Sequence, residues 1–258
     1  MTVYFIGAGP GAADLLTLRG RALIERCPVC LYAGSLVPAE VVAYAPAGAA
    51  VIDTAPLNLD EIIAHMAAAH AEGQDVARVH SGDPSLYGAI AEQMRRLDEW
   101  GIPYEVVPGV SSFTAAAAAL KLELTPAGAN QTVILTRAPG RTGLPENEAL
   151  AELARHRTGL VLFLSAAQVP AVVEALAPHY GPDAPVVVAY RVSWPDQVLL
   201  RCTLATLAAE MKAAGIRLTA LILVGPMLEP ERGRDSRLYD PGYSHRFRRG
   251  SRPDARPG

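Results

Sequence analysis

The chain has 258 residues, of which 50% are hydrophobic and 19% charged, and its formal net charge at pH 7 is -3. This composition supplies a sizeable core and excludes a wholly disordered protein. The slightly negative charge argues against a general nucleic-acid binder, because neutralising phosphates requires a basic face. No apolar run in the sequence reaches the length of a membrane-spanning helix.

The start of the chain leads directly into strand-like residues, without the positive region and cleavage site of a signal peptide. We therefore expect a cytoplasmic protein, in which cysteines stay reduced. Cys27 and Cys30 have the C-x-x-C spacing of a redox pair or of half a metal site. Because only Cys202 remains as a third thiol and Cys30 lies in an apolar run, we favour buried structural thiols and expect no metal site.

Apolar runs and helical patterns alternate along the first half of the chain. Strand-like runs occupy residues 3–6, 29–32, 51–52, 76–79 and 104–107, and helical patterns lie near residues 15–25, 59–71 and 85–98. This alternation predicts an α/β unit with a mostly parallel sheet.

The same alternation starts again after a cluster of breakers at residues 124–130. Strand-like runs occupy residues 133–136, 160–164, 186–190 and 221–224, and helical patterns lie near residues 146–156, 169–177 and 204–213. We therefore predict two α/β domains, residues 1–122 and residues 123–240, with a cleft where their strand ends face each other. Residues 241–258 combine arginine with Pro, Gly and Ser, which favours a flexible, solubilising tail over a nucleic-acid arm.

The stretch VYFIGAGPGAADLLTLRG, residues 3–20, contains a glycine loop between a strand and a helix. Residues 7–12 satisfy the permissive G-x-G-x-x-A form of a dinucleotide fingerprint, which also needs an acidic residue at the end of the second strand. That end reads LYAGS and offers no carboxylate, and Pro10 removes a backbone N–H from the loop. The loop therefore predicts close backbone approach to a ligand other than a pyrophosphate.

Two further loops of this kind follow predicted strands. HSGDPSLYG, residues 80–88, follows the fourth strand, and VPGVSS, residues 107–112, follows the fifth. Asp83 has the place of a helix cap and Pro84 suits the first helical position, so capping alone would account for Asp83. Three such loops at one edge nevertheless predict a binding crevice in an open α/β sheet.

These loops together resemble those of the tetrapyrrole (precorrin) methyltransferase family of cobalamin and sirohaem synthesis. The resemblance runs from residue 3 to about residue 248, and it includes the alanine-rich segment after VPGVSS. It implies a homodimer of subunits with two α/β domains and a cleft that binds S-adenosylmethionine. Residues 31–37, 189–196, 238–240 and 244–248 resemble the members that methylate C-11 of precorrin-4 to give precorrin-5 in cobalamin (vitamin B12) biosynthesis.

The resemblance thus implies an S-adenosylmethionine-dependent C-methyltransferase with S-adenosylhomocysteine as product. The cofactor contacts that it implies are Pro10, Ser81, Gly82, Asp83, Leu86, Tyr87, Ser111, Ser112, Leu164, Ser165, Tyr190, Arg191, Val192, Thr219 and Ala220. Methyl transfer is an in-line displacement, so the protein's main task is to position the two reactants. The sequence assigns no general base and no other catalytic residue.

A polycarboxylate tetrapyrrole needs cationic partners, and arginine holds a carboxylate by two parallel hydrogen bonds. The candidate substrate contacts are Gly9, Arg19, His80, Arg137 and Arg141. For each arginine an exposed surface charge is an equally good interpretation, and for His80 a structural role is the better one.

Three alternatives stay open. The substrate can be the cobalt complex of precorrin-4, or the methylated position can be another carbon of the macrocycle, although residues 31–37 and 190–196 argue against the latter. The third alternative is a nucleotide-sensing α/β protein without chemistry, against which the missing ribose carboxylate counts.

Overall fold

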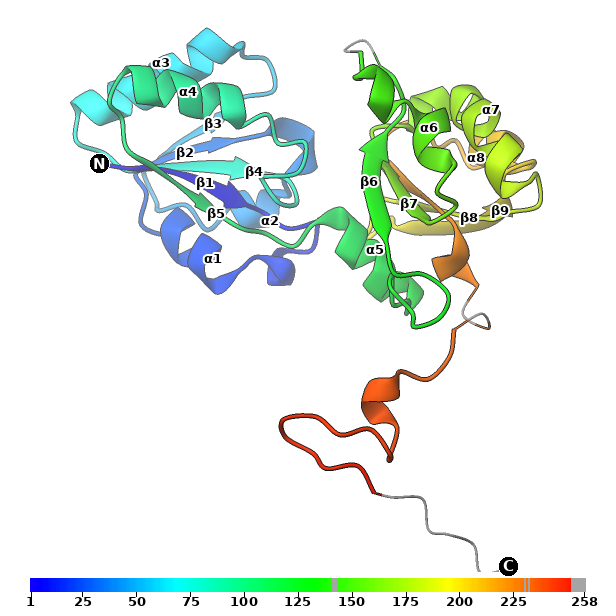
Figure 1. The fold of residues 1–258 in the computed structure, drawn as a ribbon. Coiled ribbons are helices and arrows are strands. Elements are labelled where there is room, and N and C mark those ends of the chain that lie inside the picture. The colour runs from blue at the N-terminus through cyan, green and yellow to red at the C-terminus, as the bar shows by residue number, and fades with distance from the viewer. Residues whose placement is uncertain (141–142, 230, 232, 252–258) are drawn as a thin grey trace, which may run out of the picture. The chain divides into compact units, whose positions relative to one another are not determined.

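The computed structural model describes residues 1–140, 143–229, 231 and 233–251. These residues form a mixed α/β structure with two compact units, shown in Figure 1. The first unit comprises Met1–Ala119 and Arg191–Val198, and the second comprises Leu120–Tyr190 and Leu199–Gly258. The α/β fold class is as predicted. The domain limits at residues 122 and 123 stay a prediction, and they do not include the return of residues 191–198 to the first unit.

The first unit is built on a parallel sheet of five strands in the order β3-β2-β4-β1-β5. Its strands are β1 (Val3–Gly7), β2 (Val29–Tyr32), β3 (Ala50–Asp53), β4 (Val76–His80) and β5 (Tyr104–Val107). Each of the apolar runs predicted in this half of the chain is a strand. The central strands β1, β2 and β4 are buried along most of their length because both faces of a parallel sheet are covered, whereas the edge strands β3 and β5 are largely exposed.

Helices cover both faces of this sheet (Figure 1). These elements are η1 (Ala13–Leu15), α1 (Leu18–Ile24), η2 (Gly34–Leu36), α2 (Ala39–Val42), α3 (Leu59–Ala71) and α4 (Ala91–Glu99). Helix α5 (Ser112–Leu120) follows β5, and its last residue belongs to the second unit. Phe5 and Met66 belong to the core on the α3 and α4 face, whereas Ile6 and Ile24 belong to the core on the α1 face. Asn58 and Glu61 form a capping box that fixes the start of α3.

The predicted helix over residues 85–98 is wrong at its start, because α4 begins at Ala91. Tyr87 has φ 57° and Ala89 has φ 51°, and a left-handed backbone cannot continue a right-handed helix. Asp83 therefore does not cap α4. Its carboxylate instead accepts a hydrogen bond from the Ser85 amide at 2.8 Å, within a turn that precedes the helix.

The second unit contains a mixed sheet of five strands in the order β6-β7-β10-β8-β9. Its strands are β6 (Val133–Arg137), β7 (Gly159–Phe163), β8 (Pro185–Tyr190), β9 (Val198–Thr203) and β10 (Ala220–Val224). Strand β6 is parallel to β7, but β10 is antiparallel to both β7 and β8. The sequence analysis predicted neither β9 nor the direction of β10.

The remaining helices belong to the second unit, where α6, α7 and α8 gather on one side of the sheet (Figure 1). The elements are η3 (Glu146–Glu148), α6 (Leu150–Ala154), η4 (Ala166–Gln168), α7 (Val169–Tyr180), α8 (Leu207–Ala213), η5 (Pro226–Leu228) and η7 (Arg237–Tyr239). Leu150, Leu176 and Leu207 from these helices share one core with Leu162 and Ile222 of the sheet. In the described part of the chain, no helix is long and apolar enough to cross a membrane.

The predicted basic tail, residues 241–258, lies inside the described residues only as far as residue 251. Up to that point it forms hydrogen-bonded turns. The Arg248 guanidinium donates to the carbonyls of Leu238 and Asp240, each at 2.7 Å, and the backbones of His245 and Arg248 pair in an isolated bridge.

Cys27 and Cys30 are free thiols with no exposed surface. Burial raises the pKa of Cys27 to about 12 and that of Cys30 to about 11, so both stay protonated at neutral pH. They have the buried structural position that the sequence analysis favoured. Within the described residues, no group of three or more His, Cys, Asp or Glu could hold a metal ion.

Candidate functional site

The carboxyl edge of the first sheet carries the three predicted loops. Gly7 pairs with His80 and Ile6 pairs with Val107, so β1, β4 and β5 end at the same level. The loops that follow these strands therefore start side by side, as expected for parallel strands.

Glycines let the three loops approach more closely than any other residue would allow. A Cβ at Gly109 would lie 2.2 Å from the carbonyl oxygen of Gly82, and one at Gly7 would lie 2.6 Å from the Cα of Gly109. Gly9 and Gly82 have φ of 78° and 63° and exchange two backbone hydrogen bonds, at 3.2 and 2.7 Å. The edge is thus closed by backbone packing.

Asp83 joins the second loop to the third. One carboxylate oxygen accepts from the Gly109 amide at 3.0 Å, and the other accepts from the amide and the hydroxyl of Ser85. Burial works to raise the pKa of Asp83, but these hydrogen bonds outweigh it and hold the pKa below its ordinary value. Asp83 is therefore an ionised brace between loops, and its contact with a cofactor stays a prediction.

His80, a candidate substrate contact, lies under this edge and is only 4% exposed. Burial, and to a smaller extent the charge of Arg78, lowers its pKa to about 3, so the ring is neutral at physiological pH. The ring packs against Phe5 with centroids 6.0 Å apart. A neutral, buried imidazole offers no cation to a carboxylate, which agrees with the structural role that the sequence analysis preferred.

Three backbone amides of the first glycine loop already donate hydrogen bonds within the protein. Ala8 donates to the His80 carbonyl at 2.7 Å, Gly9 donates to the Gly82 carbonyl, and Ala12 donates to the Ser193 hydroxyl at 2.9 Å. Pro10 has no amide hydrogen. A phosphate cradle needs several free amides pointing at one anion. The geometry therefore agrees with the expectation that this loop does not bind a pyrophosphate.

The predicted residues of the second unit meet at one edge of its own sheet. Arg137 pairs with Phe163 across β6 and β7, and Ala220 pairs with Tyr190 across β10 and β8. Because β10 is antiparallel, its first residues lie beside the last residues of β7 and β8. Residues 164–165 and 219–220 are thereby brought to the edge at which Arg137 and Tyr190 lie.

Strained backbone coincides with several predicted cofactor contacts. Tyr87, Leu164, Arg191 and Thr219 have φ of 57°, 51°, 43° and 55°, the left-handed region that non-glycine residues avoid. Leu164 is also 66% exposed although it is apolar. Strain of this kind persists only where the surrounding structure enforces it, and it is enriched at binding sites.

Ser165 differs from its exposed neighbour Leu164, because its side chain has no exposed surface. Its hydroxyl accepts from the Ala138 amide and donates to the Phe163 carbonyl, both at 2.7 Å. The hydroxyl thus ties the end of β6 to the end of β7. Ser165 therefore acts as a tie between two strands, and its contact with a cofactor stays a prediction.

The predicted arginines have different surroundings. Arg19 is exposed on α1, whereas Arg137 is half-buried at the end of β6 and donates to the Gly143 carbonyl at 3.0 Å. Arg191 pairs with Asp196 at 2.7 Å, and its guanidinium lies 4.1 Å from the centroid of the Trp194 ring. Arg141 lies outside the described residues.

The remaining predicted contacts lie on the loops described above. Ser81 and Leu86 are half-buried in the second loop, Ser111 is 7% exposed, and Ser112 begins α5. The sequence analysis missed Ser193 and Trp194, which contact the first glycine loop. Both belong to the stretch AYRVSWPD that carried part of the resemblance, so only their contact partners were beyond prediction.

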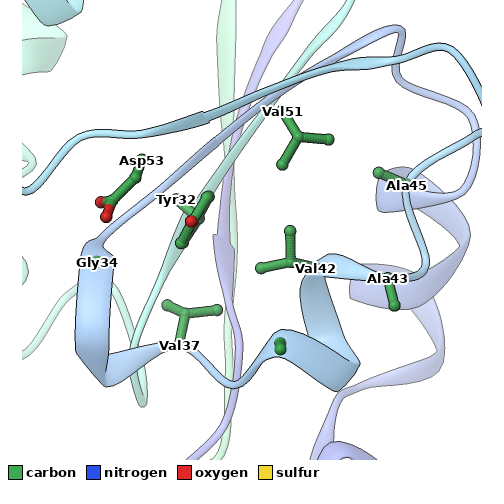
Figure 2. Close-up of a pocket in the computed structure, with 9 residues that line it drawn as sticks. Tyr32, Gly34, Val37, Val42, Ala43, Ala45, Val51 and Asp53 are labelled. Carbon is green, nitrogen blue, oxygen red and sulfur yellow. The ribbon is translucent and has the colours of Figure 1, made fainter.

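A separate cavity of about 620 Å³ lies between β2, β3 and α2 in the first unit. Figure 2 shows Tyr32, Val37, Val42 and Val51 around it, with Asp53 at one end. Asp53 accepts a hydrogen bond from the Ala55 amide, so part of its carboxylate already has a partner. The cavity contains none of the predicted cofactor or substrate contacts.

Comparison with known proteins identifies the family. The family model of Tetrapyrrole (Corrin/Porphyrin) Methylases matches residues 2–208. A Precorrin-4 C(11)-methyltransferase of Mycobacterium tuberculosis is 56% identical over 96% of this chain and 99% of the relative. A Cobalt-precorrin-4 C(11)-methyltransferase of Methanocaldococcus jannaschii is 44% identical over 96% of each chain.

Two solved structures are also similar. A cobalt precorrin-4 methyltransferase, described as a cobalamin biosynthetic enzyme, has a TM-score of 0.86 and 46% identity, covering 89% of this chain and 96% of that one. A uroporphyrin-III C-methyltransferase of Thermus thermophilus in complex with S-adenosylhomocysteine has a TM-score of 0.73 and 29% identity, covering 88% and 99%. The glycine-packed edge of the first sheet and the strained edge of the second agree with these matches. The matches show that the chain belongs to the tetrapyrrole methyltransferase family.

Proposed function

We propose that this chain transfers a methyl group from S-adenosylmethionine to C-11 of precorrin-4, giving precorrin-5 in cobalamin biosynthesis. The name of the 56% identical relative supports this position of methylation. The observation on this chain that carries the proposal is the left-handed backbone at Tyr87, Leu164, Arg191 and Thr219, four of the residues that the resemblance assigns to the cofactor.

The residues at the two sheet edges suit an S-adenosyl ligand better than a dinucleotide. Leu86 and Leu164 offer apolar surface for the adenine and the methionine chain, and Ser81 offers a small polar group beside the glycines. Val192 and Ser111, by contrast, are buried. The loop amides of Ala8, Gly9 and Ala12 already have partners in the protein. We therefore propose that the full set of cofactor contacts named from the sequence holds S-adenosylmethionine.

S-Adenosylmethionine, when bound, supplies a methyl group on a sulfonium for in-line displacement by a nucleophilic carbon. In this proposal the chain positions the two reactants, because holding them in a reactive geometry removes up to about 7 to 11 kcal/mol of a reaction barrier. Asp83 keeps two loops together as a braced carboxylate, and His80 is buried and neutral. Neither is poised as a general base, so we assign none.

Substrate carboxylates need arginine partners, and Arg137 is the best placed of the candidates that the structure describes. It lies at the end of β6, at the same sheet edge as residues 164–165 and 219–220. Arg19 is the second candidate, exposed on the helix that follows the first glycine loop. We leave His80 and the buried Gly9 out of the proposed substrate contacts.

The direct test combines a calorimetric titration with a turnover assay. We expect S-adenosylhomocysteine to bind and NAD to give no heat, which separates a methyltransferase from a nucleotide sensor. The assay uses methyl-labelled S-adenosylmethionine with enzymatically generated precorrin-4, and carbon NMR locates the label. Label at C-11 is the expected result, and label at another carbon would contradict the proposed position.

The cobalt complex of precorrin-4 is a second candidate substrate, because relatives of both names cover nearly the whole chain. Parallel assays with the metal-free and cobalt forms decide between them by the ratio of kcat/KM. The proposal also includes a homodimer, as the resemblance implies, and a cytoplasmic location. Sedimentation equilibrium tests the dimer, and a monomer at assay concentrations would contradict it.

A further inference from the structure

The segment that connects β8 and β9 packs with the first unit, although both strands belong to the sheet of the second unit. Residues Arg191–Val198 follow Tyr190 directly, yet they group with the first unit. Within that unit they contact the first glycine loop through two side chains that no comparison or sequence pattern assigns to a role.

The two contacts are hydrogen bonds of good length. The indole N–H of Trp194 donates to the carbonyl of Pro10 at 2.9 Å, and the hydroxyl of Ser193 accepts from the amide of Ala12 at 2.9 Å. Gly11 lies between these anchor points. A Cβ on Gly11 would come within 2.3 Å of Cδ1 of Trp194, so only glycine fits beneath the indole.

The connection is itself braced in the conformation that makes these bonds. The Arg191 guanidinium stacks over the Trp194 ring at 4.1 Å and pairs with Asp196 at 2.7 Å. The Ser193 amide donates to the side-chain oxygen of Gln197 at 2.8 Å. Ser193 has φ 68°, so the segment holds a strained residue at its point of contact.

We infer that Ser193 and Trp194 are positioning residues for the methyl donor, an inference that rests on the proposed function. Pro10, whose carbonyl Trp194 holds, and Arg191, which stacks on Trp194, are both proposed donor contacts. The two side chains act through those neighbours. They hold residues 10–12 and residue 191 in one arrangement before the donor arrives, which reduces the ordering cost of binding.

Trp194→Phe is the first test, because phenylalanine keeps a ring and removes the N–H donor. The chain has two tryptophans. Trp100, 57% exposed at the end of α4, provides the matched control Trp100→Phe. We expect Trp194→Phe to raise the Kd for S-adenosylhomocysteine about fivefold, in the range of one lost hydrogen bond. The control should stay within about twofold of the wild type.

Steady-state kinetics separate positioning from a general loss of structure. For Trp194→Phe we expect the KM for S-adenosylmethionine to rise by the same factor, with the KM for the macrocycle and kcat nearly unchanged. A fall in kcat together with similar rises in both KM values, or no change in any of the three, would overturn the inference. Ser193→Ala removes the other bond and should show the same restriction to the donor KM, in case Trp194→Phe folds poorly.

Gly11→Ala tests the geometry from the other side of the contact. In the wild-type background its methyl group meets the indole, and we expect at least a tenfold loss of S-adenosylhomocysteine affinity. In the Trp194→Ala background the indole is gone and the Ser193 hydroxyl, 2.9 Å from the new methyl group, is the remaining close atom, so the further loss should fall below about threefold. Equal losses in the two backgrounds would show that Trp194 does not occupy this position.

Trp100→Phe also turns Trp194 into a single fluorescent reporter of the native contact. Because the inference has Trp194 in its contact before the donor arrives, its emission maximum should stay nearly constant during titration with S-adenosylhomocysteine, and a large shift during calorimetrically verified binding would overturn the inference alone. A wild-type protein that fails to bind S-adenosylhomocysteine would overturn the proposed function, and the inference with it.

Discussion

The two sheet edges reach similar loop geometry by opposite means. In the first unit the left-handed positions at which the loops touch through backbone atoms belong to Gly9 and Gly82, although Tyr87, farther along the second loop, is left-handed too. In the second unit the left-handed positions belong to Leu164 and Thr219, which keep side chains at a conformational cost. The loops of the first edge pack closely because glycines have no side chain there. The second edge has side chains at left-handed positions where glycine would be less strained.

This difference indicates that the residues at the two edges have different roles. Glycine at the first edge serves close packing, because a side chain there would collide with the neighbouring loop. Leucine at position 164 contributes little packing to its unit, since 66% of its surface is exposed. A strained and exposed side chain is expected where contact with a ligand compensates for its cost. Mutations at the two edges should therefore change different properties of the protein.

The largest expected effect is on the glycine-packed edge. Gly109→Ala places a methyl group 2.2 Å from the Gly82 carbonyl and 2.7 Å from the Cα of Gly7. Since neither is the end of a flexible side chain, we expect the free energy of unfolding to fall by about 3 kcal/mol or more, measured by urea denaturation. Gly143→Ala is the control, because nothing lies within 4 Å of its new methyl group. A loss at Gly109 as small as in this control would contradict backbone packing.

A smaller loss is expected at the buried hydroxyl of the second edge. Ser165→Ala leaves the Ala138 amide without its acceptor inside the protein. An unpaired buried amide costs about 2 kcal/mol, which should appear as a lower urea midpoint at unchanged slope. Thr219→Ala, at an exposed position of the same edge, should change stability by less than about 0.5 kcal/mol. Similar midpoints for the two variants would be evidence against the tie between β6 and β7.

The third prediction concerns pH and the first unit. The pKa of His80 is about 3 in the native state, against 6.5 without the protein environment. Below 6.5 the unfolded chain takes up a proton that the native state does not, so stability falls as the pH decreases toward 3. Between about pH 7.5 and about pH 5.5 this group should contribute a loss of about 1.4 kcal/mol.

His80→Leu is the comparison for this pH effect, because it keeps an apolar side chain at the position and removes the titration. Other groups titrate alike in both proteins, so the difference between their stability curves isolates His80. If the curves of stability against pH were parallel for the two proteins between about pH 7.5 and about pH 5.5, His80 would take up its proton in the native state as it does in the unfolded chain, contrary to its burial.

The smallest expected change in stability is at Leu164, where the effect on function should be larger. Leu164→Gly relieves about 1 kcal/mol of left-handed strain, which offsets the greater entropy of the unfolded chain. Stability should therefore stay within about 0.5 kcal/mol of the wild type, while affinity for S-adenosylhomocysteine falls. Leu218→Gly, at an exposed residue outside the left-handed positions, has no strain to relieve and should lose about 1 kcal/mol. Equal losses at the two leucines would remove the argument from strain.

Much of the fold was predictable because the central strands of its sheets are buried on both faces. Residues 3–6 are apolar throughout, residues 76–79 and 104–107 are apolar except for Arg78 and Glu105, and each run is a strand of the parallel sheet. Strand β9 escaped prediction because it lies at the end of the sheet order, with no fully buried residue and with Arg201 and Thr203 interrupting its apolar residues. The late start of α4 depends on the left-handed Tyr87 and Ala89, which have no propensity signal of their own.

The candidate site was predictable as a set of loops. The glycines of residues 7–11 and residue 82 mark places where the backbone turns or approaches another segment closely, and these are local requirements. The partners of those glycines were not predictable. Trp194 meets Pro10 across 184 positions of the chain, and only the folded path of the β8 to β9 connection brings them together.

The sequence by itself determined the α/β class, the parallel strands of the first unit and the family resemblance, because apolar period and glycine loops are properties of short segments. The tertiary structure alone decided the antiparallel direction of β10, the neutral state of His80 and the contact of Ser193 and Trp194 with the first loop. Those three depend on which distant residues surround a group. Burial, register and hydrogen-bond partners come from the packing of the whole chain, and no short segment of the sequence contains them.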